Sequence, residues 1–446
     1  MSKFKNSSSF RDTSGFIYTL DNILYRQINK YGAGDFEIFI QSGLYQLLLE
    51  KRYIIAHSEV SNKYAFNDKA FKVLKPSIIN FISYPYEWSF SMLKDAALLT
   101  LCIQKHALNY SMSLKDATAY NIQFYKGKPI FIDTLSFELF KNTPWKAYGQ
   151  FCRHFLAPLI LASYVDIRLT DLLKNYIDGI PLDLVSKILP LKTRFNPNIF
   201  AHIYLHSKSI KVHEDNPRNI KTLKMNKEMH LKLISGLESF INGLKWKPKN
   251  TEWGDYYTFT NYTDESFDKK KEIVSRFINK INPQNLWDIG ANNGLFSRIA
   301  SDLGIETIAF DIDPIAIEKS YLKLKKDNEQ HILPLICDLT NPIPPIGWAN
   351  EERNGFMQRG KADCVMALAL IHHLAISNNL PFEKIAEFLS RISNYLIIEF
   401  VPKEDSKVRI LLATREDIFD RYDINNFKKE FEKYFKIILK LLKNLL

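Results

Sequence analysis

Short apolar runs alternate with amphipathic helical stretches throughout the C-terminal part of the chain. The pattern predicts strands over residues 285–290, 306–313, 332–339, 362–370 and 395–401. It predicts helices over residues 266–281, 294–303, 314–327, 382–392 and 424–435. Strands that alternate with longer amphipathic helices are typical of βαβ units on a parallel sheet. Because right-handed crossovers place helices on both faces, we expect an α/β fold with a doubly wound, Rossmann-like sheet over residues 266–446.

The residue composition of the rest of the chain is different. Residues 1–215 are rich in aromatic residues and leucine and contain few glycines. Residues 216–265 contain an amphipathic helical stretch and then a polar loop rich in Tyr and Trp. We therefore expect one domain over residues 1–215, a helical linker with a loop over residues 216–265, and the sheet domain over residues 266–446.

Composition supports a globular protein with more than one core. The 446 residues are 46% apolar and 24% charged. The four cysteines lie far apart without a C-x-x-C pair, which argues against a disulfide framework or a structural zinc site and favours a reducing cytoplasm. The N-terminus lacks the apolar region of a signal peptide, and the longest apolar stretch, residues 155–165, is too short to span a membrane. These features predict a soluble, cytoplasmic protein.

The net charge of +11 permits contact with anions without requiring it. No block of Lys and Arg with interleaved aromatic residues is present, and no nucleic-acid-binding module is recognisable. We therefore expect a solvated basic surface and no specific nucleic-acid partner.

Acidic residues end three successive predicted strands. The first strand runs into Asp288-Ile289-Gly290-Ala291-Asn292-Asn293-Gly294, where small residues would let the backbone approach a ligand. Asp311 ends the second strand, 23 residues after Asp288, and Asp338 ends the third. A carboxylate at a sheet edge gains little by itself, so three in consecutive βα units indicate a binding site at the carboxyl ends of the strands.

These residues resemble the first motif of class I S-adenosylmethionine-dependent methyltransferases, Asp/Glu-x-Gly-x-Gly-x-Gly. Gly290 and Gly294 match it, and Asn292 stands at the middle glycine, where Asn tolerates a left-handed backbone. The alternative, a nicotinamide dehydrogenase, would show G-x-G-x-x-G instead of the G-x-x-x-G found here. The resemblance implies the cofactor S-adenosyl-L-methionine. Its methionine part would be bound by Asp288, Gly290, Asn292 and Gly294, its ribose by Asp311 and its adenine by Asp338.

The resemblance narrows to the nodulation-protein-type methyltransferase family. It is carried by WGDYY at 253–257 and NYT at 261–263, by ALALIHHLAISNNLPFEKIAEFL at 367–389 and by YLIIEFVPKEDSKV at 395–408. By this likeness Tyr257 and Tyr262 would belong to a lid over the cofactor; the alternative is that these aromatic residues only pack a domain interface. The likeness also implies a hydroxyl of a glycan or other small molecule as methyl acceptor.

Two histidines follow the fourth predicted strand. An imidazole at this place could deprotonate an acceptor hydroxyl, which makes His372 and His373 candidate general bases. Because neighbouring residues at a helix start point about 100° apart, we expect one of them, His373, at the pocket wall and the other packed against neighbouring loops. The alternative is that one imidazole packs against the cofactor and the other caps a helix.

The N-terminal part carries a second, weaker pattern. Residues 114–133 read LKDATAYNIQFYKGKPIFID, in which Asp116 and Asn121 have the D-x-x-x-x-N spacing of a kinase catalytic loop and Asp133 follows. Residues 1–215 therefore resemble a protein-kinase-like or aminoglycoside-phosphotransferase-like fold. The resemblance implies an N-terminal α+β kinase-like domain, with Asp116 as base and with Asn121 and Asp133 as ligands of Mg²⁺ beside ATP.

Several features depart from that family. No glycine-rich phosphate loop precedes the predicted hairpin at 16–28, Lys115 stands where Arg or Gly is usual, and Arg26 is the nearest candidate for the strand lysine. Two interpretations stay open. The chain could be a bifunctional kinase–methyltransferase that modifies one acceptor, or its N-terminal domain could be a binding module without catalysis.

Overall fold

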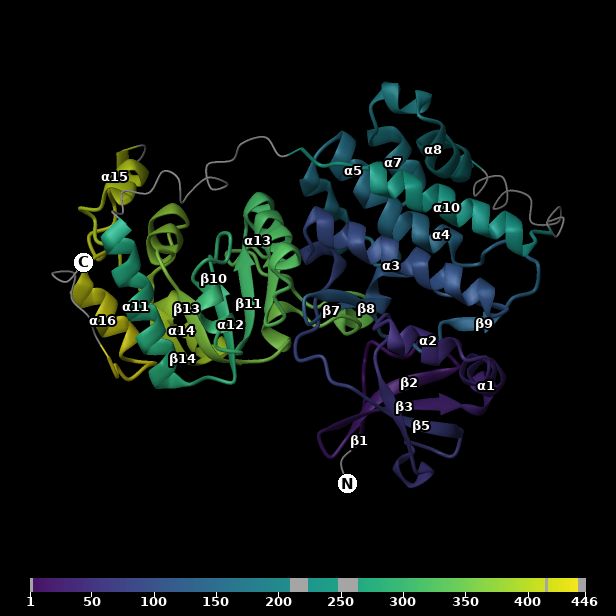
Figure 1. Ribbon diagram of the computed structural model, residues 1–446. Coiled ribbons are helices and arrows are strands. Elements are labelled where there is room, and N and C mark those ends of the chain that lie inside the picture. Colours follow the sequence, from purple (N-terminus) through teal and green to yellow (C-terminus); the bar gives the residue numbers. More distant parts are fainter. Residues whose placement is uncertain (1–2, 209–223, 248–263, 414–415, 440–446) are drawn as a thin grey trace. The chain divides into compact units, whose positions relative to one another are not determined.

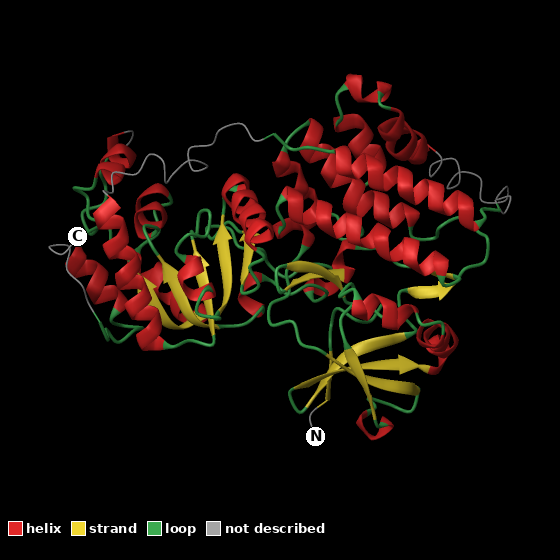
Figure 2. Ribbon diagram, in the orientation of Figure 1, coloured by secondary structure: helices red, strands yellow, loops and turns green. Residues whose placement is uncertain are grey.

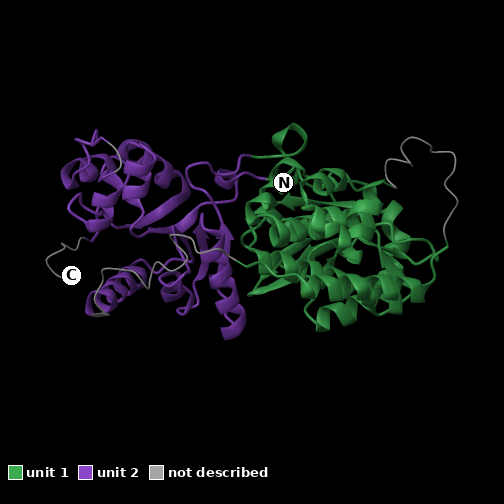
Figure 3. Cartoon of the chain, turned by 90° about the horizontal axis from the view of Figure 1, so that it is seen from above, with its two compact units in different colours: residues 1–247, 345–353 green, residues 248–344, 354–446 purple. Residues whose placement is uncertain are grey.

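The computed structural model describes residues 3–208, 224–247, 264–413 and 416–439. The chain forms two compact units, which Figure 3 shows in different colours. Unit 1 consists of Met1–Lys247 and Pro345–Arg353, and unit 2 of Pro248–Pro344 and Asn354–Leu446.

Unit 1 begins with a small antiparallel sheet. Its strands are β1 (Lys3–Lys5), β2 (Gly15–Leu20), β3 (Ile23–Asn29), β4 (His57–Val60) and β5 (Ala70–Pro76), in the order β1-β2-β3-β5-β4. Helices α1 (Ala33–Gln41) and α2 (Leu44–Glu50) lie between β3 and β4 in sequence (Figure 1). Alternate side chains of β2 point inward and form a small aromatic core with Tyr25 and Val73.

The rest of unit 1 is mainly helical (Figure 2). The helices are α3 (Phe90–Asn109), α4 (Tyr148–Phe151), α5 (Ala157–Tyr164), α6 (Leu172–Asn175), α7 (Leu182–Ile188), α8 (Pro197–Ile199) and α10 (Lys227–Gly243). Two short antiparallel pairs follow α3, namely β6 (Met112–Leu114) with β9 (Phe137–Leu139) and β7 (Ile122–Tyr125) with β8 (Lys128–Phe131). A small sheet lobe followed by a helical lobe confirms the expected α+β, kinase-like architecture.

Unit 2 contains a parallel sheet. Strands β10 (Asn285–Ile289), β11 (Glu306–Asp311), β12 (Ile332–Ile336), β13 (Ala362–Ala367) and β14 (Ser393–Ile398) lie in the order β12-β11-β10-β13-β14. Its helices are α11 (Asp264–Ile281), α12 (Ser297–Ser301), α13 (Pro314–Asp327), α14 (Phe382–Ile392), α15 (Ser406–Ala413) and α16 (Ile424–Phe431). The order reverses between β10 and β13, which makes this the topological switch point.

The doubly wound, Rossmann-like sheet predicted from the sequence is thereby confirmed. The predicted helices over 314–327 and 382–392 have the observed bounds of α13 and α14, whereas α12 is shorter than the predicted 294–303 and α15 was not predicted. One core cluster explains the packing: Val274 and Ile278 of α11 lie against Leu286 of β10 and Met366 of β13. Burying such side chains stabilises the fold by about 1.5–3 kcal/mol each.

The compact units divide the chain differently from the expected ranges 1–215, 216–265 and 266–446. Helix α10 belongs to unit 1 because it packs along α3, where the Lys94 ammonium donates to the backbone carbonyls of Asn242 and Leu244. Segment 345–353, between β12 and β13, also belongs to unit 1. In the part of the chain that the structure describes, no helix is both long and apolar enough to cross a membrane.

Candidate functional site

The loop after β10 is shaped by three residues with a positive φ. Gly290, Asn292 and Gly294 have φ values of 75°, 50° and 76°. A side chain at Gly290 would meet Leu370 Cδ1 at 3.1 Å, and one at Gly294 would meet Arg298 Nη1 and Ser320 Oγ, each at 2.9 Å. Asn292 therefore adopts the left-handed backbone expected of it, and the two glycines lie where a Cβ would press against neighbouring side chains.

Asp288 is buried at the end of β10. Its side chain accepts a hydrogen bond of 2.6 Å from Ser297 Oγ, and only 2% of the residue is exposed. Burial raises the pKa of Asp288 to about 7, and the nearby charge of Asp311 adds to the rise, while Ser297 and Lys270 oppose it. A carboxylate in such surroundings favours a cationic ligand.

Asp311 ends β11, which pairs with β10, and Asp338 follows β12, which pairs with the other side of β11. Asp311 Oδ2 accepts the N–H of Asn292 at 2.7 Å, which ties the end of β11 to the loop. Burial raises the pKa of Asp311 to about 6, although backbone N–H groups partly offset it. Asp338 is half-buried two residues after β12, and its Oδ1 accepts the N–H of Thr340 at 2.8 Å. The Cys337 N–H donates to the Asp311 carbonyl, so the three acidic strand ends follow one another along one edge.

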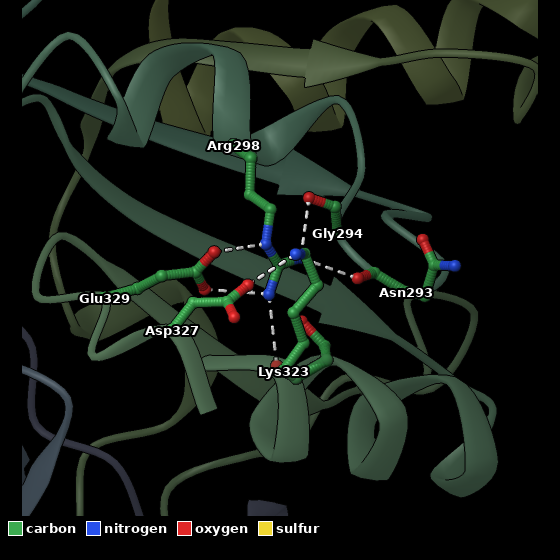
Figure 4. A network of polar contacts seen from close by, with 7 residues as sticks. Asn293, Gly294, Arg298, Lys323, Asp327 and Glu329 are labelled. Carbon is green, nitrogen blue, oxygen red and sulfur yellow. Dashed lines mark hydrogen bonds and ion pairs between the residues drawn. The ribbon is translucent and has the colours of Figure 1, made fainter. Parts of the chain in front are cut away.

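A buried arginine, Arg298, supports the loop through hydrogen bonds to its backbone carbonyls. The sequence did not predict this role. Figure 4 shows Arg298 of α12 with Nε and Nη2 on the two carboxylate oxygens of Glu329, at 2.6 and 2.8 Å. Its Nη1 donates to the carbonyls of Asn293 and Gly294 at 2.8 and 3.0 Å. Arg298 thus holds the backbone turn that contains the glycines. The ion pair of Arg298 with Glu329 could not be predicted from the sequence because the two residues are 31 positions apart.

The residues at this edge fit S-adenosylmethionine. At Gly290 and Gly294 a Cβ would meet side chains of the protein itself, so only glycine fits the tight turn there. The adjoining carboxylates match a cofactor that carries an ammonium group, a sulfonium and ribose hydroxyls. The residues that would hold it are Asp288, Gly290, Asn292, Gly294, Asp311 and Asp338. Tyr257 and Tyr262, the expected lid residues, lie outside the described residues.

A cavity of about 1350 Å³ adjoins the ends of β13 and β14. Its wall includes His372, Glu399 and Lys270, together with aromatic side chains such as Phe400 and Phe427. The sequence favoured His373 at the pocket wall, whereas the structure places His372 there and His373 outside the lining. The centroids of the two imidazole rings lie 4.0 Å apart. Because successive residues of a helical turn point about 100° apart, one ring faces the cavity and the other does not.

Both imidazoles are held in the neutral form. Burial, with His373 beside it, lowers the pKa of His372 to about 3, and burial also lowers the pKa of His373. The Nδ1 atom of His372 is buried without a hydrogen-bond partner in the described part of the chain. A neutral ring has a lone pair to accept a proton, and a strongly lowered pKa makes it a weak base at neutral pH.

A second buried ion pair, also missed from the sequence, shapes the wall of this cavity. Lys270 Nζ of α11 lies 2.7 Å from Oε2 of Glu399, and the same oxygen accepts the N–H of Ala369 at 2.8 Å. Ala369 has a φ of 49°, a left-handed conformation that costs energy for a residue with a Cβ. The pair therefore holds a strained turn whose next residue, Leu370, packs against Gly290.

In unit 1 the kinase-like residues converge. Asn121 Nδ2 donates to Ser136 Oγ at 3.2 Å, and Ser136 Oγ donates to Asp133 Oδ2 at 2.5 Å. Arg26 of β3 forms an ion pair with Asp133. Burial raises the pKa of Asp116, with the charge of Asp133 contributing and the Asn121 amide opposing, so Asp116 lies in the same cluster.

The charge of Asp133 is compensated inside the protein. Burial would raise its pKa, but the Arg26 guanidinium and the Ser136 hydroxyl outweigh burial and hold the pKa below its ordinary value. Among the residues that the structure describes, no group of three or more His, Cys, Asp or Glu is arranged to hold a metal ion. A cation at Asp133 would therefore have to displace Arg26.

Comparisons with known proteins give one full-length relative. No family model matches the chain. Nodulation protein NoeA of Rhizobium meliloti (strain 1021) is 34% identical over 442 residues, which cover 97% of this chain and 92% of that protein.

Solved structures match shorter parts of the chain. The bifunctional kinase–methyltransferase WbdD is 16% identical, with a TM-score of 0.26, and the match covers 37% of this chain and 33% of that one. Magnesium protoporphyrin IX methyltransferase from Synechocystis PCC 6803, with bound S-adenosylhomocysteine, is 16% identical with a TM-score of 0.25, over 35% of this chain and 68% of that one.

The length of the match to nodulation protein NoeA assigns this chain to a family. It runs through unit 1 and unit 2 alike, and it agrees with the resemblance that the motifs at 253–263 and 367–408 predicted. The chain therefore belongs to the family of nodulation protein NoeA, the nodulation-protein-type methyltransferase family that its C-terminal motifs resemble.

Proposed function

We propose that unit 2 transfers the methyl group of S-adenosylmethionine to a hydroxyl of a small-molecule or glycan acceptor. The observation that carries the proposal is the row of Asp288, Asp311 and Asp338 at the carboxyl ends of β10, β11 and β12, beside a loop opened by Gly290 and Gly294. When bound, the cofactor supplies a methyl group on a sulfonium, which is already an electrophile.

The chain's own residues have to bind the cofactor, orient the acceptor and take up the proton of the acceptor hydroxyl. Asp288 would accept the ammonium group of the methionine part, Asp311 the two ribose hydroxyls and Asp338 the adenine amino group. The acceptor would enter from the cavity beside β13 and β14, whose large volume suits a substrate of several rings. Alignment of the acceptor hydroxyl with the methyl group would supply much of the rate enhancement.

His372 and His373 are the proposed proton acceptors. His372 faces the cavity, but its pKa of about 3 makes it a weak base at neutral pH. We therefore keep His373 as the first candidate; its ring centroid lies 4.0 Å from that of His372. Neither ring is needed to bind the cofactor.

The test is calorimetric titration with S-adenosylmethionine. Asp311→Ala should weaken binding by about 1–3 kcal/mol, because two ribose hydroxyls lose their charged acceptor. His373→Ala is the matched control: it should keep the affinity and lose most turnover, measured as transfer of labelled methyl groups to fractionated cell extract. Unchanged affinity in a folded Asp311→Ala protein would remove Asp311 from the site.

A second candidate function is phosphoryl transfer by unit 1, in a bifunctional kinase–methyltransferase. The convergence of Asp116, Asn121 and Asp133 favours it. Mg²⁺ is usually bound by one or two carboxylates together with the phosphates of the nucleotide, so Asn121 and Asp133 would suffice once Arg26 moves onto the ATP phosphates. Asp116 would then accept the proton of the acceptor hydroxyl. Without ATP binding, unit 1 remains a candidate non-catalytic binding module.

Asp133→Ala distinguishes these possibilities. It should abolish Mg²⁺-dependent ATP binding, measured by titration with the nucleotide, because the metal loses its carboxylate. The same variant should bind S-adenosylmethionine with unchanged affinity, since Asp133 belongs to unit 1. If the wild-type protein binds no ATP in the presence of Mg²⁺, the cluster is structural and the binding-module interpretation holds.

A further inference from the structure

Unit 1 exposes large apolar side chains on the turns around α8. Leu191 and Phe195, the first and last residues of a 3-10 turn, are 71% and 90% exposed. Phe200 and Leu205, the first and last residues of the π-helical turn that follows α8, are exposed as well. A single exposed apolar residue is normal on a protein surface, whereas several in one short segment indicate an interaction site.

One buried residue fixes the direction in which the 3-10 turn faces. Thr193 is 1% exposed, and its hydroxyl donates to the Pro190 carbonyl at 2.7 Å and lies 2.9 Å from the Tyr204 hydroxyl. Because Thr193 is held inside, the two residues on either side of it stay in contact with solvent. These exposed residues are Leu191, Lys192, Arg194 and Phe195. The outer side of the turn therefore combines two apolar and two basic side chains.

A hollow of about 400 Å³ lies beside this turn and is lined mainly by cations. Lys187 of α7, Arg194 of the turn and Lys208 line it, together with one carboxylate, that of Asp183. The Arg194 guanidinium carbon lies 5.5 Å from the centroid of the Tyr204 ring, which also belongs to the lining. Within the described part of the chain, none of the three basic residues forms an ion pair. The hollow therefore has a net positive charge and favours an anion.

The apolar and basic side chains together decide which anionic partner fits. A small soluble anion would be attracted by the cations but would leave Leu191 and Phe195 in water. The surface of an anionic bilayer uses both kinds of side chain, because lipid phosphates attract Lys and Arg while Leu and Phe enter the boundary between headgroups and acyl chains. Figure 1 shows α7 and α8 at the end of unit 1 opposite its antiparallel sheet, a place that a flat surface can reach.

We propose that this end of unit 1 docks onto an anionic lipid bilayer. A headgroup phosphate would occupy the hollow between Lys187, Arg194 and Lys208, where a guanidinium fork matches phosphate oxygens. Leu191 and Phe195 would enter the bilayer surface beside it. The docking goes beyond the proposed function, and it requires neither S-adenosylmethionine nor ATP.

Sedimentation of the full chain with lipid vesicles tests the proposal. Vesicles of equal parts phosphatidylcholine and phosphatidylglycerol are compared with vesicles of phosphatidylcholine alone. We expect the wild-type protein to bind the mixed vesicles and not the neutral ones, because only the mixed surface attracts the basic side chains. Added salt should weaken this binding, since it screens the attraction.

Two variants with matched controls locate the docking surface. Phe195→Ser should weaken binding to the mixed vesicles about tenfold, because the ring no longer enters the bilayer. Arg194→Gln should weaken it roughly fivefold, because one cation near the lipid phosphates is lost. The controls remove an exposed aromatic ring and an exposed arginine elsewhere, by Tyr31→Ser and by Arg391→Gln in α14, and should bind as the wild-type protein does. All four positions are exposed, so none of the changes empties a core.

Glycerol 3-phosphate distinguishes a bilayer from a soluble anion. At constant ionic strength, an excess of it should leave the wild-type protein on the mixed vesicles, because the apolar side chains hold only to lipid. Release by glycerol 3-phosphate would overturn the proposal and make the hollow a site for soluble anions. The proposal also fails if the wild-type protein does not sediment with the mixed vesicles, if it binds the neutral vesicles equally, or if the four variants bind alike.

Discussion

Arg298→Met should destabilise the cofactor loop by about 3–5 kcal/mol. The change removes the partner of Glu329, whose side chain is 14% exposed, and so leaves a largely buried carboxylate uncompensated. It also deprives the carbonyls of Asn293 and Gly294 of their donor. Native-state hydrogen exchange over residues 285–311 is the suitable measurement, because it reports the stability of this region separately from the rest of the chain.

Two further variants make this result specific. Lys323→Met removes the exposed partner of Asp327 on α13, which Figure 4 shows beside Arg298, and it should change exchange very little. Arg298→Met combined with Glu329→Leu should recover part of the loss, because no unpaired charge remains. If Arg298→Met and Lys323→Met gave the same exchange rates, the buried pair would not support the loop.

Asp288→Asn should stabilise the ligand-free protein at alkaline pH while abolishing cofactor binding. The pKa of Asp288 is about 7 in the folded protein against an ordinary value of 3.8. The folded state therefore holds this proton more tightly than the unfolded state, and stability falls as the pH rises from about 4 to about 7. Above pH 7 the ionised side chain of Asp288 lowers the free energy of unfolding by at most about 4 kcal/mol, since each unit of pKa difference corresponds to roughly 1.4 kcal/mol.

A comparison of the wild-type and Asp288→Asn proteins at two pH values tests the raised pKa of Asp288. At pH 8 Asp288→Asn should unfold at a higher urea concentration than the wild-type protein, and at pH 4 the two midpoints should coincide. Asp311, whose pKa is also raised, is present in both proteins, and because its charge acts on Asp288, the difference between the proteins reports Asp288 together with this interaction. A midpoint for Asp288→Asn at or below that of the wild-type protein at pH 8 would contradict the raised pKa.

The acidic strand ends could be predicted because each lies within two residues of the end of its strand. The period of the apolar residues located β10, β11 and β12, and carboxyl ends of parallel strands meet at one edge. The conformation of Asn292 also followed from residue type, since Asn adopts a positive φ more readily than other side chains.

The supporting ion pairs could not be predicted in the same way. Lys270 and Glu399 are 129 residues apart, and an amphipathic pattern gives no sign that a lysine of α11 points inward. The choice of His373 over His372 depended on the rotation of one helical turn, which the sequence does not determine. The docking of segment 345–353 rests on Glu352 meeting Arg11, 341 residues away in the chain.

That segment has a consequence for the order in which the protein is made. Glu352 and Arg353 complete the packing around Arg11 and Tyr120, but the ribosome synthesises them after β10, β11 and β12. Domains usually fold as units during synthesis, with the N-terminal one first. Here the first unit to be synthesised cannot be finished until three of the five strands of the second sheet have been made, so synthesis of the two units is interleaved.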